Sequence, residues 1–228
     1  MTNTPLAIVG YGKMGRMVAQ LAPEYGFEVT ATIDAGDSLD AARNASVAIE
    51  FSTPETAVSN IEGLISLNVP VVCGATGWFA HLEKVKASVE SANGAFVWSP
   101  NFSIGVNVFT RVVAEAAKLL ADEKEYGAWA WEIHHDAKKD TPSGTLLKLV
   151  GAMKLAGYTR AVDRSSNRAG AHPGTHEIGF DSAADTITLR HSARSREGFA
   201  RGSLKAAQWI KNRKGVFEFS EVLFGRDV

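Results

Sequence analysis

The sequence lacks the features that mark several specialised classes of protein. It has a single cysteine among 228 residues, so it can form no internal disulfide and offers no cysteine cluster for zinc. It also lacks an excess of charge, because 24 basic residues face 25 acidic ones and leave a formal net charge of −1. Nucleic-acid-binding proteins usually carry a basic excess. We therefore expect no nucleic-acid partner.

The amino-terminal segment lacks a targeting pattern. Its apolar stretch ends at Gly10, which is too short for the core of a signal peptide or for a membrane span. This predicts a cytoplasmic protein with no membrane partner. Cys73 lies in an apolar segment and is expected to be a buried hydrophobe in that reducing compartment. The rest of the composition, 45% hydrophobic and 21% charged, is typical of a globular protein.

Short apolar runs alternate with helical patterns in the first hundred residues. The runs are Leu6–Val9, Phe27–Ile33, Val47–Phe51, Val69–Cys73 and Ala95–Trp98. They are almost continuously apolar, as parallel strands covered on both faces tend to be. Segments such as Met14–Tyr25 and Glu55–Leu67 are long enough for crossover helices. This order predicts an α/β fold that begins with a Rossmann-type, doubly wound parallel sheet.

The pattern changes near residue 103, where a second domain of mixed α+β type is predicted. Asn107–Asp122 has helical spacing, and Ala128–His135 alternates as a half-buried strand does. Thr141-Pro142 predicts an N-cap and first helical residue, with the helix running to about Gly157. The other expected elements are a long loop at Arg164–Gly174, strands at Thr175–Phe180, Thr186–Ser192 and Val216–Phe219, and a helix at Gly202–Asn212.

The segment Gly10-Tyr11-Gly12-Lys13-Met14-Gly15 is a G-x-G-x-x-G motif between an expected strand and an expected helix. In that context the first glycine allows a tight turn and the second lets the backbone approach a pyrophosphate. The third lets the helix pack closely on the strand. The motif therefore predicts a dinucleotide site, and the alternative is a plain glycine turn of an α/β domain.

Asp34 bears on which dinucleotide binds. It ends the second expected strand, where a carboxylate accepts hydrogen bonds from the adenosine ribose and repels a 2′-phosphate. The next residues, Ala35 and Gly36, offer no basic side chain for such a phosphate. This favours NADH over NADPH, unless Asp34 is only a solvated turn residue.

Two more loops follow expected strands. They are Gly74-Ala75-Thr76-Gly77 and Ser99-Pro100-Asn101-Phe102. Ligands of open α/β sheets bind outside the carboxyl ends of the strands, so both loops are candidates to border the nicotinamide half of the cofactor. By themselves they are only turns.

The densest set of reactive side chains lies in the segment Glu132–Thr145. His134 and His135 are neighbours on a strand, so they face opposite sides of the sheet and should differ in role. Imidazole exchanges protons near neutral pH, and Lys138 can neutralise a carboxylate or donate a proton. The backbone of Ser143-Gly144-Thr145 at a helix start can bind a carboxylate. Together these groups suit a small, multiply anionic substrate.

Two other interpretations of this segment stay open at this point. The histidines can cap a sheet edge while the lysines are solvated. Alternatively the pair can bind a metal ion, which needs a third ligand such as His172 or His176.

The pattern Glu132-x-His134-His135-x-x-Lys138-x-Asp140-x-Pro142-Ser143-Gly144-Thr145 resembles the hallmark of the 4-hydroxy-tetrahydrodipicolinate reductases of bacterial lysine biosynthesis, also called dihydrodipicolinate reductases. The similarity covers nearly the whole chain. It extends to Gly10–Gly15, Gly74–Gly77, Asn101–Asn107 and Ser195–Gly202.

The resemblance implies an NAD(P)H-dependent oxidoreductase that reduces 4-hydroxy-tetrahydrodipicolinate to tetrahydrodipicolinate with loss of water, in lysine and diaminopimelate biosynthesis. It implies a dinucleotide-binding domain made of residues 1–102 and 203–228. Residues 103–202 would form a substrate-binding domain whose sheet mediates a homotetramer. NADH is the expected cofactor and NADPH a possible one, the substrate is a dicarboxylate, and no metal is implied.

The resemblance also assigns individual residues. His134 and Lys138 correspond to the catalytic proton donors of the family. The implied substrate-binding residues are His135, Ser143, Gly144 and Thr145. The implied cofactor-binding residues are Gly10, Tyr11, Gly12, Lys13, Met14, Gly15, Asp34, Gly74, Ala75, Thr76, Ser99, Pro100, Asn101 and Phe102.

Two alternative functions remain. A reductase of the same build acting on another small anion is possible, because a fold does not fix a substrate. A catalytically silent protein that binds NADH as a sensor is the other, although a sensor would need neither His134 nor Lys138.

Overall fold

The computed structural model describes residues 3–225, and the chain divides into two compact units. The first unit consists of Met1–Ser103 and Glu197–Val228, apart from residues 1–2 and 226–228, which lie outside the described part. The second unit is Ile104–Arg196. The sequence places the return to the first domain at residue 203, whereas the structure groups the whole of helix α6 (Glu197–Ile210) with the first unit.

The first unit is built on a six-stranded parallel sheet in the order β10-β5-β4-β3-β1-β2. Its strands are β1 (Thr4–Val9), β2 (Phe27–Ile33), β3 (Val47–Glu50), β4 (Val71–Cys73), β5 (Ala95–Trp98) and β10 (Gly215–Glu218). The chain runs outward from β1 to β2 and then returns across β1 to β3. The strand order therefore reverses between β1 and β3, where doubly wound sheets bind ligands.

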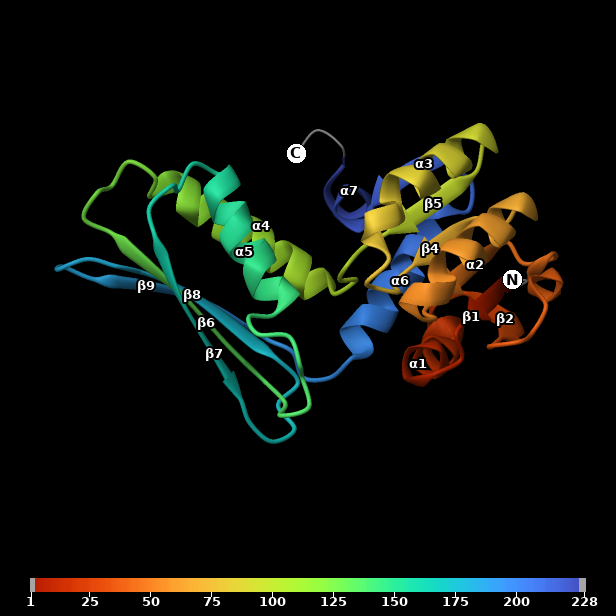
Figure 1. Cartoon of the computed structure of the whole chain (residues 1–228), viewed down its shortest axis with the longest axis horizontal. Helices are drawn as coiled ribbons and strands as arrows, with labels where there is room; N and C mark the ends of the chain where they lie inside the picture. Colours follow the sequence, from red (N-terminus) through yellow and green to blue (C-terminus); the bar gives the residue numbers. More distant parts are fainter. Residues whose placement is uncertain (1–2, 226–228) are drawn as a thin grey trace. The chain divides into compact units, whose positions relative to one another are not determined.

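Helices cover both faces of this sheet, so the predicted Rossmann-type fold is confirmed (Figure 1). They are α1 (Lys13–Leu21), α2 (Pro54–Ser66), α3 (Leu82–Ser91), α6 and α7 (Phe219–Phe224), with short 3-10 turns η1 (Ala22–Tyr25), η2 (Leu39–Ala42) and η3 (Phe79–His81). Helices α2 and α3 pack together on one face, while α1 packs against α6 on the other. Helix α1 ends at Leu21, earlier than the expected Tyr25, and a 3-10 turn containing Pro23 continues it, because proline disrupts an α-helix interior.

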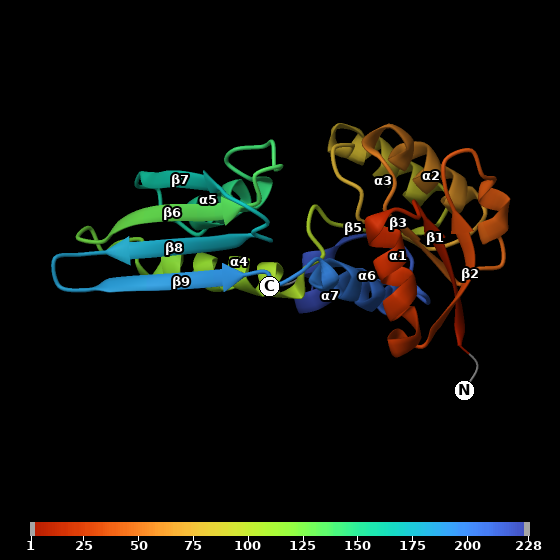
Figure 2. The ribbon, with the colours of Figure 1, turned by 90° about the horizontal axis from the view of Figure 1, so that it is seen from below.

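The second unit has a four-stranded mixed sheet in the order β7-β6-β8-β9. Its strands are β6 (Gly127–His134), β7 (Val162–Arg168), β8 (Thr175–Asp181) and β9 (Thr186–Ser192), and only the β6–β7 pair is parallel. Helices α4 (Ile104–Leu119) and α5 (Gly144–Leu155) cover one face (Figures 1 and 2). The core lies between these helices and the sheet, where side chains such as Val113, Leu149 and Ile178 are fully buried.

Strand β6 shows the predicted alternation. Ala130, Glu132 and His134 are buried on the helix side, whereas Trp129 and Trp131 are only partly buried and lie on the other face. The expected mixed-sheet domain is therefore confirmed, and its reactive strand carries a carboxylate and an imidazole into the interior.

Two local predictions in this unit were wrong. The segment expected to be a loop, Arg164–Gly174, contains the last five residues of strand β7. This edge strand pairs with β6, but its side chains are polar and show no strand pattern in the sequence. Helix α5 begins at Gly144 and not at Pro142, because the N-cap is Ser143 and not Thr141. The Ser143 Oγ accepts a hydrogen bond from the Leu146 N–H at 3.1 Å. The Thr141–Pro142 peptide bond before it is cis.

Two further expectations concern membrane-spanning segments and the burial of the cysteine. Within residues 3–225, no helix is both long enough and apolar enough to cross a membrane. Cys73 is fully buried, as predicted.

Candidate functional site

The glycine loop between β1 and α1 has three glycines with three different surroundings. Gly10 has φ +85°, and a Cβ there would lie 2.5 Å from the Phe51 carbonyl oxygen. At Gly15 a Cβ would collide with the Gly10 carbonyl, so this glycine allows α1 to pack closely on the turn. At Gly12 a Cβ would meet nothing within 4 Å, which leaves the backbone open to a ligand.

Helix α1 begins at this loop without a competing group. Gly12 is its N-cap, no side chain caps it, and its first turn contains no acidic residue. The first N–H groups of a helix and its dipole favour an anion at that end. The loop therefore fits a dinucleotide pyrophosphate, with Tyr11, Lys13 and Met14 completing the predicted set.

Asp34 lies at the level of this loop. Strands β1 and β2 pair so that Val9 is opposite Ile33, and the Gly10 N–H donates to the Ile33 carbonyl at 2.8 Å. Asp34 follows directly and is exposed, and its Oδ1 accepts a hydrogen bond from the Ala35 N–H at 3.1 Å. An exposed carboxylate at this edge is available to ribose hydroxyls.

The other two predicted loops lie at the same edge of the sheet. Gly74–Thr76 follows β4 and Ser99–Phe102 follows β5, and all these strands are parallel. A Cβ at Gly74 would collide with the ring of Phe51, so this loop is packed against the end of β3. The Ser99 hydroxyl donates to the Asn101 carbonyl at 2.8 Å and fixes the second loop.

Sequence reasoning missed Glu50, which closes β3 at this edge and is fully buried. Its Oε1 accepts hydrogen bonds from the Ser52 N–H at 2.9 Å and from the Ser52 hydroxyl, and Asn60 Nδ2 lies 3.4 Å away. Its Oε2 accepts from the Cys73 Sγ at 3.0 Å. The carboxylate thus ties together the ends of β3 and β4 and the start of α2. A charged residue ending an apolar strand was the available signal.

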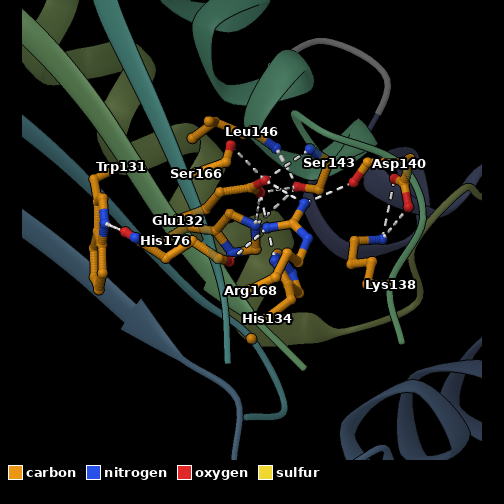
Figure 3. Close-up of polar contacts among 12 residues, drawn as sticks. Trp131, Glu132, His134, Lys138, Asp140, Ser143, Leu146, Ser166, Arg168 and His176 are labelled. Carbon is orange, nitrogen blue, oxygen red and sulfur yellow. Dashed lines mark hydrogen bonds and ion pairs between the residues drawn. The ribbon is translucent and has the colours of Figure 1, made fainter. Parts of the chain in front are cut away.

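In the second unit, Glu132 is the centre of a buried network (Figure 3). Its Oε1 accepts hydrogen bonds from the Ser143 N–H, the Ser166 hydroxyl and Arg168 Nη2, each at 2.9 Å. Its Oε2 accepts one from the Ser143 hydroxyl. Burial alone would raise the pKa of Glu132, but the hydrogen bonds from Ser143, Arg168 and Ser166 lower it to about 2. Glu132 is therefore a fixed anion.

Two imidazoles lie beside this anion. His134 Nδ1 is 3.6 Å and His176 Nε2 is 3.4 Å from Glu132 Oε2, and the two rings meet edge to face. His176 Nε2 also lies 3.2 Å from the Ser143 Oγ. Burial lowers the pKa of both histidines, that of His176 to about 4, so both are neutral near pH 7. His134 Nδ1 is buried and makes no hydrogen bond within residues 3–225.

Lys138 lies in the loop that follows β6. Its Nζ forms an ion pair with Asp140, with N···O distances of 2.8 and 3.0 Å. Burial would raise the pKa of Asp140, but the ion pair with Lys138 lowers it. Arg168 Nη2 also donates to the Asp140 carbonyl at 2.6 Å, so Arg168 joins this loop to Glu132. The charge of Lys138 contributes to lowering the pKa of His134.

The predicted anion-binding residues begin helix α5. The Ser143 N–H and hydroxyl are already engaged by Glu132, as described above. Gly144 is the first helical residue, and a Cβ there would meet nothing within 4 Å, so the space next to it is open. Thr145 follows it in the first turn, and His135 is partly buried just beyond β6.

Ser166, Arg168 and His176 also belong to this site, although only His176 was considered from the sequence, as a metal ligand. Glu132, His134 and His176 each place a ligand atom within 4.8 Å of the others. However, Glu132 already binds the Arg168 guanidinium, whose positive charge opposes a second cation. His172 makes a different contact, because its Nδ1 accepts a hydrogen bond from the Gly174 N–H at 3.3 Å.

Comparison with known proteins gives one consistent result. Residues 4–102 match the family described as "Dihydrodipicolinate reductase, N-terminus", and residues 105–223 match "Dihydrodipicolinate reductase, C-terminus". A 4-hydroxy-tetrahydrodipicolinate reductase of Christiangramia forsetii is 32% identical over 233 residues, covering 96% of this chain and 97% of that protein. One of Lawsonia intracellularis is 30% identical over 245 residues, covering 92% and 94%.

A solved structure shows the same fold. Dipicolinate-bound dihydrodipicolinate reductase from Paenisporosarcina sp. TG-14 has a TM-score of 0.78 to this chain at 19% identity, covering 96% of this chain and 99% of that one. Both units therefore have counterparts in a single known architecture.

Proposed function

Because the chain belongs to the dihydrodipicolinate reductase family, we propose that it reduces 4-hydroxy-tetrahydrodipicolinate to tetrahydrodipicolinate with loss of water, in lysine and diaminopimelate biosynthesis. The observation that carries this proposal is the complete segment Glu132–Thr145, which folds so that Glu132, His134 and the start of α5 share one network. The net reaction takes up a hydride and a proton and releases water.

Family membership and the Rossmann-type sheet imply a pyridine nucleotide cofactor. We propose that the first unit binds NADH and accepts NADPH as an alternative to it. When bound, it supplies the hydride. The N–H groups at the start of α1 bind the pyrophosphate beside Gly12, where a side chain is absent. Asp34 accepts the ribose hydroxyls and disfavours a 2′-phosphate. The loops after β4 and β5 border the nicotinamide half.

We propose that the second unit binds the substrate. Dipicolinate, a ring with two carboxylates, is bound by the Paenisporosarcina protein, and a dicarboxylate suits this unit as well. One carboxylate accepts N–H groups at Gly144 and Thr145, because the start of α5 is open there and carries the positive end of the helix dipole. The Thr145 hydroxyl and His135 add further donors.

His134 and Lys138 are proposed as the proton donors. His134 is buried beside Glu132 and neutral near pH 7, so its imidazole must take up a proton before it can donate one to the substrate. Lys138 forms an ion pair with Asp140 and places a cationic proton donor in the loop that follows β6. Ser166, Arg168 and His176 act through Glu132, and we assign them to positioning.

We also propose that the protein is cytoplasmic and a homotetramer. The support for assembly is the face of the β7-β6-β8-β9 sheet that α4 and α5 do not cover (Figure 2). On this face the large aromatic side chain of Trp131 is only partly buried. Light scattering of the purified chain gives the mass directly, and a monomer would contradict this part of the proposal.

The decisive experiment mixes the protein, NADH and freshly prepared 4-hydroxy-tetrahydrodipicolinate and follows the loss of NADH absorbance. Oxidation that depends on this substrate supports the proposal. Oxidation only with another small anion would indicate a relative with a different substrate. NADH binding without turnover would indicate a sensor. The His134→Gln variant is the control, because it should bind NADH and turn over slowly.

A further inference from the structure

A basic depression lies at the edge of the first sheet opposite the glycine loop. Its volume is about 660 Å³. The residues that line it are Thr4, Ala45, Ser46, Asn68, Pro70, Lys211, Asn212, Arg213 and Lys214. All of them precede or begin a strand: Thr4 opens β1, and the others lie just before β3, β4 and β10.

This position separates the depression from the proposed cofactor site. The strands are parallel, so their starts lie along one edge and the loops that follow them along the other. Strand β1 alone has six residues, which spans about 20 Å at about 3.3 Å per residue. A ligand in the depression would therefore not touch the glycine loop, Asp34 or the loops after β4 and β5.

The charge of the lining is one-sided. Lys211, Arg213 and Lys214 are cations, and none of the nine lining residues is acidic. In the part of the chain that the structure describes, no ion pair joins these three cations to a carboxylate. Such a concentration is unexpected in a chain whose formal net charge is −1. Three unneutralised cations around one hollow attract an anion.

Two of these cations are already held in place. Lys211 is partly buried, and its Nζ donates to the Thr4 Oγ1 at 3.3 Å. The Arg213 Nη1 donates to the Trp209 carbonyl at 2.5 Å, and its guanidinium lies 4.2 Å from the centre of the Trp209 ring. Because these side chains are partly ordered before binding, less entropy is lost when a ligand arrives. Asn68, Asn212 and Ser46 add neutral polar groups.

We propose that this depression is a second ligand site, which binds a small organic anion with two or more negative charges. The volume lies in the range of small-molecule sites, about 300–1,000 Å³, and three cations match phosphate or carboxylate groups better than a neutral ligand. Phosphorylated compounds and polycarboxylates share this chemistry. The site is independent of the proposed reaction, because it uses none of its residues.

The test is calorimetric titration with tripolyphosphate and, separately, with citrate. The protein is first saturated with NADH, so that the glycine loop does not compete for phosphate. The test variant carries Lys211→Gln, Arg213→Gln and Lys214→Gln. The matched control carries Lys118→Gln, Lys124→Gln and Lys154→Gln, three exposed cations of the second unit, and so loses the same charge elsewhere.

We expect saturable binding of at least one anion to the wild type and to the control variant. The test variant should bind it at least about 10-fold more weakly, as loss of hydrogen bonds from charged donors requires. Tighter binding of tripolyphosphate would identify phosphate as the preferred group, and tighter binding of citrate would identify carboxylate. The rate of substrate-dependent NADH oxidation, measured without tripolyphosphate or citrate, should be equal in all three proteins.

Two results would overturn the proposal. One is an absence of saturable binding of either anion to the wild type. The other is equal weakening in the test and control variants, which would show a general effect of net charge. Neither result would bear on the reductase activity, because the depression variant leaves its residues unchanged.

Discussion

Replacing Arg168 by methionine removes the guanidinium that forms an ion pair with the buried Glu132 carboxylate. Glu132 has no exposed surface, and its pKa falls from the ordinary 4.5 to about 2 although burial alone would raise it. That fall corresponds to about 3 kcal/mol in favour of the ionised form. In Arg168→Met, Glu132 stays buried. The hydrogen bonds from the Ser143 hydroxyl and N–H compensate its negative charge only in part. We expect a loss of about 3 kcal/mol in the free energy of unfolding at pH 7, as for a broken buried ion pair.

The same argument fixes the pH dependence. A carboxyl group whose pKa is lowered in the folded state stabilises the protein above the unfolded pKa, here near 4.5. That contribution is lost as the pH falls toward about 2. In Arg168→Met the folded pKa of Glu132 is higher, so less stability is lost over this interval. The difference between the wild type and the variant should therefore narrow as the pH is lowered through it.

Urea unfolding followed by circular dichroism measures both effects, and hydrogen exchange of β6 and β7 assigns them to the second unit. The matched control is Arg164→Met, on the same strand with an exposed side chain, which should change stability by less than about 0.5 kcal/mol. Equal stability of the two variants at pH 7 would refute the reasoning. So would a difference that does not narrow on acidification.

Three further predictions concern the reaction. Asp34→Ala should narrow the preference for NADH over NADPH in kcat/KM, because the carboxylate repels a 2′-phosphate. His134→Gln and Lys138→Ala should each lower kcat by about 100-fold or more, the scale of general acid catalysis, while NADH binding measured by fluorescence stays nearly unchanged. Gly144→Val should raise KM strongly and weaken competitive inhibition by pyridine-2,6-dicarboxylate, because a side chain enters the open space at the start of α5. Thr145→Val should cost about 1–3 kcal/mol of substrate binding.

Each of these predictions has an outcome that contradicts it. A wild-type preference for NADPH would remove the assigned role of Asp34. Near-normal turnover in both the His134 and Lys138 variants would place the proton donors elsewhere. If pyridine-2,6-dicarboxylate inhibits wild type and Gly144→Val equally, the carboxylate does not bind at α5.

Elements with strong periodicity were predictable. The five apolar runs of the first hundred residues are strands in the structure, and β6 buries Glu132 and His134 on one face as its alternation requires. The edge strand β7 was not foreseen, because Asp163–Arg168 is polar throughout and its order comes from pairing with β6. The start of α5 was misplaced because Thr141-Pro142 and Ser143 are both plausible caps in a linear sequence.

The candidate site was predictable only where its residues are close in sequence. The spacing of His134, Lys138 and Gly144 carries a strong local pattern. Ser166 and Arg168 contact Glu132 from another strand, 34 and 36 residues away, so no local pattern points to them. Glu50 carried a local signal, a charged residue at the end of an apolar strand, but its partner Cys73 lies 23 residues away on the next strand of the sheet.

The insertion of the second unit into the first has a consequence for synthesis on the ribosome. Strand β10 pairs with β5, and α6 packs against β3, β4 and α1, yet both are translated only after residues 104–196. Until then one edge of β5 in the nascent first unit has no partner strand. The sheet also lacks helix α6, whose side chains Ala200, Leu204 and Ala207 are buried in the folded protein. The second unit, which is continuous, has all its own contacts available earlier. Nascent chains are therefore most vulnerable to aggregation through the unit that emerges first.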